Sequence, residues 1–203
     1  MIPTINLPEN EKLRLDVWTA SKVREYGEYP ADKRSAMSHA AGHIIMATAL
    51  GYKVTHARLT QIQSPGAIRW DCLIDLDSPL VYKDEDSKGA ERHLMLLKAA
   101  LYFRAGFEGE LFDIVAHGSS ALNDRFWSEF LCEHLDDYIN LPDKTTFYRV
   151  VAFAEKILAD NFGVFAGLLF HLDTRDDLTE YDLSLCLPAV EVHDVTELLG
   201  GLQ

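Results

Sequence analysis

The chain has 203 residues, of which 48% are hydrophobic and 25% are charged, a composition typical of a soluble globular protein with a substantial core. Its formal net charge is −13 at pH 7, which argues against nucleic acids and anionic membrane surfaces as partners. The three cysteines form no Cys-x-x-Cys pair, so neither a disulfide framework nor a thiolate zinc site is expected.

The first ninety residues combine helical patterns with one strand pair. Gly51 is a good C-terminal stop for a helix, and Ser64-Pro65-Gly66 is a turn between two runs of alternating β-type residues, which predicts a β-hairpin. In chain order we expect an irregular arm at 1–10, a helix over 11–27, a helix from 31 to 50, strands over 53–63 and 67–76, and an exposed loop over 77–89.

The remainder of the chain follows a helical pattern. Gly106 and Gly109 are expected to end the first of these helices, and Ser119 or Ser120 is placed to cap the next. The expected helices cover 91–107, about 120–137, 146–162, 163–172 and 180–187. The prediction is therefore a mainly α fold of the α+β class with one small β-hairpin or sheet.

Residues 38–43 read Ser-His-Ala-Ala-Gly-His. His39 and His43 are four residues apart, so on a helix they share one face and could hold one metal ion. In the HExxH signature the residue after the first histidine is the glutamate that acts as general base, and here that position is Ala40. A pair of core histidines bonded to backbone is the competing interpretation, although Gly42 indicates a special packing role because glycine costs about 1 kcal/mol inside a helix.

A metal site needs at least a third ligand. Asp124 follows a turn at a helix start, while Glu108 and Glu110 lie near a helix end, and spacing alone leaves these three candidates open. His117 is a further residue that could line the cleft. The other histidines are expected to be ordinary surface or core residues.

Several segments together resemble the peptidase domain of the FtsH-type zinc metalloproteases. Besides the histidine helix, they include a strand after it, a helix similar to the family's Ala-Gly-Arg-x-Ala-Glu, and a segment similar to its Thr-Gly-Ala-x-Asn-Asp. In this chain they are Lys53–Leu59, Leu101–Phe112 and Ser119–Asp124. The resemblance covers most of the chain, which implies an N-terminal arm and helix at 1–30, a zinc peptidase domain at 31–190 and a C-terminal tail at 191–203.

Carried onto this chain, the resemblance implies Zn²⁺ bound by His39, His43 and Asp124, with Glu110 contacting a ligating histidine. It also implies that an extended peptide substrate adds to the strand that carries Val54, Thr55 and Arg58. The family's ATPase loop and membrane spans are not found in this sequence, so a substrate would have to be accessible already or be delivered by a partner protein. No secretory signal is recognisable either, and a cytoplasmic location is expected.

Alanine at position 40 removes the group that accepts the proton of the attacking water, a loss of roughly 10²–10⁴-fold in rate. Together with the resemblance, this implies a zinc metalloendopeptidase fold in a form that is catalytically inactive. Two origins compete, a natural pseudoprotease that binds peptides and an inactivated form of a working peptidase, and the retained zinc residues favour the second. A helical interaction protein without metal is the third hypothesis.

Overall fold

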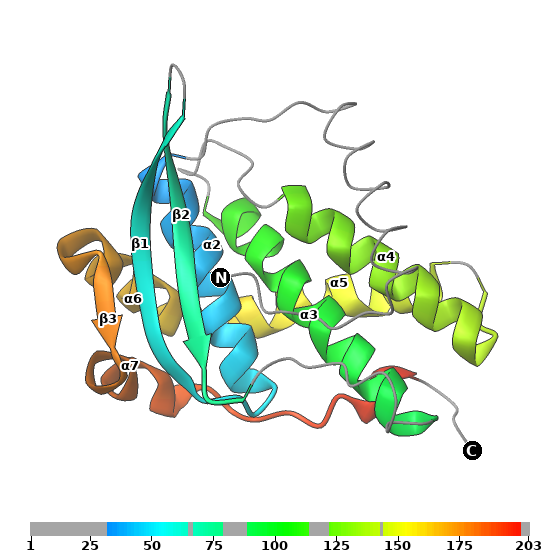
Figure 1. Ribbon diagram of the computed structural model, residues 1–203. Helices are drawn as coiled ribbons and strands as arrows, with labels where there is room; N and C mark the ends of the chain where they lie inside the picture. The colour runs from blue at the N-terminus through cyan, green and yellow to red at the C-terminus, as the bar shows by residue number, and fades with distance from the viewer. Residues whose placement is uncertain (1–31, 65–66, 79–88, 114–121, 143, 200–203) are drawn as a thin grey trace.

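The computed structural model describes residues 32–64, 67–78, 89–113, 122–142 and 144–199. These residues are mostly helical and contain one small antiparallel sheet, which confirms the expected mainly α, α+β fold (Figure 1). The elements are α2 (Lys33–Ala49), β1 (Val54–Ser64), β2 (Ala67–Leu76), α3 (Ala90–Phe112), α4 (Leu122–Ile139), α5 (Thr145–Asp160), α6 (Phe162–Arg175), β3 (Asp177–Thr179) and α7 (Glu180–Cys186), followed by 3₁₀ turns η1 (Leu187–Ala189) and η2 (Thr196–Leu199).

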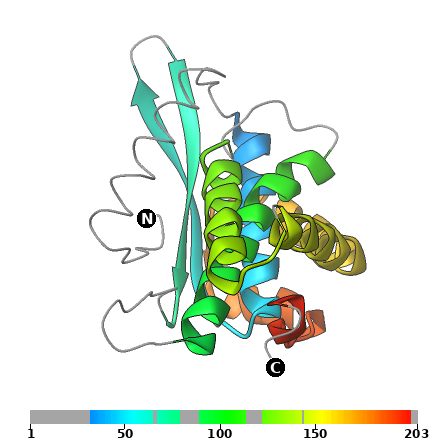
Figure 2. The same cartoon turned by 90° about the vertical axis from the view of Figure 1, so that its right-hand side faces the viewer.

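Helix α2 is the centre of the molecule. It contacts both long strands on one side and α3, α5 and α6 on the others, and nearly all of its residues are buried. Figure 2 shows the helices gathered on one side of the sheet. An apolar helix of this kind is expected to lie inside a core rather than at its surface, which agrees with the sequence from Ala36 to Leu50.

Both ends of α2 follow from local sequence. Asp32 caps the N-terminus, where its side chain accepts a hydrogen bond from the amide of Ser35 at 2.7 Å. Gly51 lies just beyond the C-terminus with φ of 85°, and the amide of Tyr52 donates to the carbonyl of Ala47 at 2.9 Å. This is the pattern of a helix closed by a left-handed glycine, so the predicted stop at Gly51 is confirmed.

Helix α3 is longer than expected because its glycines do not end it. The helix passes through Gly106 and Gly109 and ends at Phe112. A Cβ atom on Gly109 would lie 2.4 Å from the carbonyl oxygen of Ser38, and one on Gly42 would lie 2.1 Å from that of Ala105. These two glycines therefore permit a close backbone contact between α2 and α3, and this contact is the packing reason for Gly42.

Strand β1 is central in the sheet, whose order is β2-β1-β3. Val54 pairs with Leu76 of β2, while Arg58 pairs with β2 on one side and with β3 on the other. Arg58 therefore does not lie at a free edge of the sheet, whereas the expectation that a substrate strand adds at Val54 and Thr55 stays a prediction. Strand β3 was not expected from the sequence, because three residues are too few to show an alternating pattern.

The C-terminal residues belong to the packed core. Val195 and Leu199 are almost fully buried, and the amide of His193 donates to the carbonyl of Ala49 at 2.8 Å. The stretch expected as a tail after residue 190 therefore packs on the domain as far as residue 199. The expected arm and helix at 1–27 and the turn at 117–120 lie outside the described residues, and the proposed domain boundaries stay a prediction.

None of the helices in the described part of the chain is both long and apolar enough to cross a membrane.

Candidate metal site

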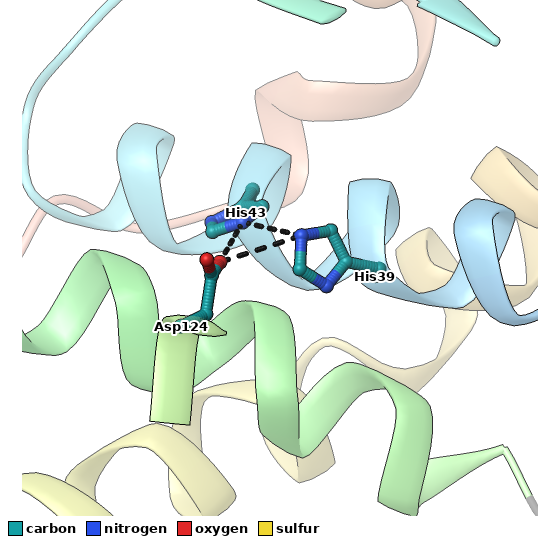
Figure 3. Close-up of side chains that lie close together, drawn as sticks. All are labelled: His39, His43 and Asp124. Atoms are coloured by element: carbon teal, nitrogen blue, oxygen red, sulfur yellow. Dashed lines mark hydrogen bonds and ion pairs between the residues drawn. The ribbon is translucent and has the colours of Figure 1, made fainter. Parts of the chain in front are cut away.

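Two helices bring the three predicted ligands together. His39 and His43 lie on one face of α2, one turn apart, and Asp124 lies in the first turn of α4. Figure 3 shows both imidazole rings and the carboxylate pointing toward a common centre. Among the described residues, this is the group of histidine, cysteine and acidic side chains whose ligand atoms lie close enough to share a metal ion.

The distances within this group fit a small metal ion. The Nε2 atoms of His39 and His43 are 2.9 Å apart, and Asp124 Oδ2 lies 3.3 Å from the first and 2.7 Å from the second. Ligands held at zinc distances of about 2.0–2.1 Å in tetrahedral geometry lie about 3.3 Å from one another. A shift of a few tenths of an ångström would therefore bring the three atoms to tetrahedral spacing.

The site is largely shielded from solvent. The exposed fractions of the His39, His43 and Asp124 side chains are 11%, 5% and 14%. Burial lowers the pKa of His39 to about 4, and the charge of His43 acts in the same direction. His39 is therefore neutral at pH 7, which is the form in which an imidazole binds a metal ion.

The other nitrogen of each ring faces an oxygen atom, at hydrogen-bond distance for His43 but not for His39. His43 Nδ1 lies 3.0 Å from the carbonyl oxygen of Tyr102, and His39 Nδ1 lies 3.7 Å from Oε1 of Glu110. A proton on Nδ1 leaves the lone pair of Nε2 directed at the centre of the group. Ligating histidines usually have such partners, which fix their tautomer and orientation.

Two buried polar atoms of the group lack a hydrogen-bond partner, His39 Nδ1 and Asp124 Oδ2. Asp124 Oδ2 is close to both Nε2 atoms but accepts a hydrogen bond from neither. Buried polar atoms without partners are costly, and in proteins such atoms often contact a bound ion or water. A cation between the three ligand atoms would satisfy the carboxylate and would let the His39 proton reside on Nδ1, toward Glu110.

Gly106 forms one wall of the site. A Cβ atom at this position would lie 2.5 Å from His43 Nε2 and 3.0 Å from Asp124 Oδ2. Any side chain here would fill the space in front of the ligand atoms. The glycine thus keeps this space open.

The structure separates Asp124 from its rival candidates. Glu108 forms a buried ion pair with Arg104, whose guanidinium also lies over the Phe107 ring. Glu110 faces Nδ1 of His39 and not the Nε2 atom that points at the centre. The structure thus brings Asp124 to both Nε2 atoms, while metal ligation itself stays a prediction. Ala40 is buried beside His39, and His117 lies outside the described residues.

Sequence reasoning missed a polar network beside the site. Asp113, at the end of α3, accepts a hydrogen bond from the hydroxyl of Ser38 at 2.6 Å and is paired with Arg34. Ser38 directly precedes His39, so the network ties the ligand helix to α3. Ser38 lies 75 residues and Arg34 lies 79 residues from Asp113 in the sequence, and no local pattern predicts a contact over such separations.

Compared with known proteins, the chain matches no protein-family model, and none of the curated proteins is significantly similar to it.

Proposed function

We propose that this chain has the peptidase fold of a zinc metalloendopeptidase and binds Zn²⁺ through His39, His43 and Asp124. The observation that supports this most strongly is the convergence of two histidine Nε2 atoms and a carboxylate oxygen at mutual distances of 2.7–3.3 Å. Two histidines and one carboxylate form a donor set of catalytic zinc sites, in which a further position is left for water. The resemblance to the FtsH-type family supports the reaction class, hydrolysis of peptide bonds.

When bound, zinc would supply a Lewis acid that polarises a carbonyl and acidifies water. The chain's own residues would orient the two imidazoles through Tyr102 and Glu110 and would shield the centre from bulk solvent. No proton acceptor occupies position 40, because Ala40 has only a methyl group there. We therefore propose that this form binds metal and hydrolyses peptides slowly or not at all.

The metal can be tested without any assay of activity. Purified protein is expected to contain one zinc ion per chain by elemental analysis, and Asp124→Ala is expected to lose it. Asp137→Ala, an exposed aspartate on the same helix, is the matched control and should retain the metal. Absence of zinc from the unchanged protein, with no uptake on addition, would refute the metal site. Retention of zinc by Asp124→Ala would refute the choice of third ligand.

The peptidase reaction is tested by restoring the base. Ala40→Glu is expected to raise cleavage of labelled casein by roughly 10²–10⁴-fold, the usual contribution of a positioned proton-transfer group. Since residue 40 is buried, circular dichroism and zinc content must show that the variant remains folded and loaded. His39→Gln in the same variant is the control and should abolish the gain.

The alanine itself favours a second candidate, a non-catalytic module that binds peptides or regulates a partner. This candidate predicts full zinc occupancy without cleavage by Ala40→Glu over a broad set of substrates. Peptide binding by the unchanged protein, measured with a library of fluorescent peptides, would then identify the ligand class.

A further inference from the structure

Tyr102 makes two separate contacts with one predicted ligand. Its carbonyl oxygen lies 3.0 Å from His43 Nδ1, and its ring stacks on the His43 ring with centroids 4.1 Å apart and planes 24° apart. Tyr102 is on α3, whereas His43 is on α2, and both side chains are nearly fully buried. The two contacts restrain different motions, since the carbonyl selects the protonated nitrogen and the stacked ring fixes the plane of the imidazole.

We infer that Tyr102 is a positioning residue, which holds His43 in the Nδ1–H tautomer and in the one ring orientation that directs Nε2 at the metal. The inference rests on the proposed metal function, because the orientation of His43 matters for a bound metal. The two contacts of Tyr102 are observed independently of that function. Neither contact involves the metal or the other ligands.

A competing role for Tyr102 is direct ligation by its oxygen. Stacking places the tyrosine ring alongside the imidazole rather than in front of Nε2. The part of Tyr102 that matters is therefore the flat ring together with the backbone carbonyl, and phenylalanine should replace it.

The neighbouring residue supplies a matched control. Phe103 is equally buried on the same helix, but its ring stacks on Trp127 with centroids 5.6 Å apart. Phe103→Leu and Tyr102→Leu each replace a buried aromatic ring by leucine and should destabilise the fold to a similar degree. A difference between them in metal binding then reports the contact with His43.

The first measurement uses the metal-free protein. Long-range ¹H–¹⁵N NMR distinguishes the two tautomers of a histidine ring, and the His43 signals are assigned by their loss in His43→Gln. We expect the Nδ1–H tautomer in the unchanged protein and in Tyr102→Phe, and a mixture of tautomers in Tyr102→Leu. A dominant Nε2–H tautomer at His43 in the unchanged protein would overturn the inference without any variant.

The second measurement is Co²⁺ binding, followed by its visible absorption. Loss of a group that orients a ligand typically weakens metal affinity by about 10–100-fold. We expect at least a tenfold loss in Tyr102→Leu with a changed absorption band, and affinities within about twofold of the unchanged protein for Tyr102→Phe and Phe103→Leu. Equal losses in Tyr102→Leu and Phe103→Leu would overturn the inference, as would an equal loss in Tyr102→Phe.

The two proposals fail in different ways. If the unchanged protein binds no Co²⁺, the metal function is refuted, while the tautomer of His43 still decides the role of Tyr102. If the metal binds and the tautomer is wrong, only the role of Tyr102 is refuted. Should Tyr102→Leu not fold, Tyr102→Met removes the ring while preserving more of its volume.

Discussion

Replacing Gly106 with alanine should strongly weaken metal binding. The added Cβ would lie 2.5 Å from His43 Nε2 and 2.7 Å from His43 Cε1. Ordinary contacts between such atoms begin near 3.5 Å, so the ring would have to retreat by about 1 Å. That movement is large compared with the roughly 0.2 Å tolerance of a zinc–ligand distance.

His43 has little freedom to make this movement. Its ring is stacked on Tyr102 and its Nδ1 faces a backbone carbonyl, so a retreat of 1 Å would break contacts on the opposite side. We therefore expect Gly106→Ala to weaken zinc binding by about 100-fold or more, the upper end of the range for a disturbed ligand. Competition with a chromophoric zinc chelator at pH 7 measures this directly.

A second glycine provides the control. Gly163 lies in α6, and a Cβ there would meet nothing within 4 Å. Gly163→Ala should stabilise the protein by about 0.5–1 kcal/mol through helix propensity alone and leave zinc affinity unchanged. If Gly106→Ala binds zinc as tightly as Gly163→Ala, the ion does not sit where the three ligand atoms converge, and the proposed site is wrong.

Three further outcomes follow from the same packing. Gly42→Ala should cost about 3 kcal/mol or more in urea unfolding, because its Cβ would lie 2.1 Å from the carbonyl oxygen of Ala105, and this backbone atom cannot turn aside. Asp113→Ala should cost about 2 kcal/mol, since the hydroxyl of Ser38 loses its buried acceptor, and Asp113→Asn should recover part of the loss. For the metal-free protein, the pKa of about 4 for His39 lies below its unfolded value near 6.5, so the unfolded chain binds more protons between these values and stability should fall as pH drops from about 6.5 to 4. Thermal unfolding in His39→Gln should show a weaker pH dependence in that window, and an unchanged dependence would contradict the assignment.

The sequence allowed the local features of the fold to be predicted, because their causes are local. The stop of α2 at Gly51, the hairpin of β1 and β2, and the i, i+4 spacing of His39 and His43 all depend on neighbours within a few residues. The end of α3 was predicted wrongly because Gly109 was interpreted as a helix terminator. Its actual role depends on a close contact with α2, which local sequence does not reveal.

The site was predictable to a similar extent. The two histidines follow from helix geometry alone, but spacing left Asp124, Glu108 and Glu110 as equal candidates for the third ligand. The direction of each side chain in the folded protein separates them. Asp124 points toward the Nε2 atoms, Glu108 toward Arg104, and Glu110 toward Nδ1 of His39. Neither Gly106 nor Tyr102 was expected to contact the ligands, because their roles emerge only when α3 is packed on α2.

The glycine contact between α2 and α3 also determines which parts of this protein can vary without disturbing its centre. At Gly42 and Gly109 the two helices touch through main-chain atoms, so no side-chain rearrangement can separate them or bring them closer. The positions of both histidines are thus set by backbone geometry and not by the particular apolar residues around them. Much of the surrounding core could be exchanged for other apolar residues of similar volume while the ligand atoms keep their places, whereas a single methyl group at the crossing would displace them.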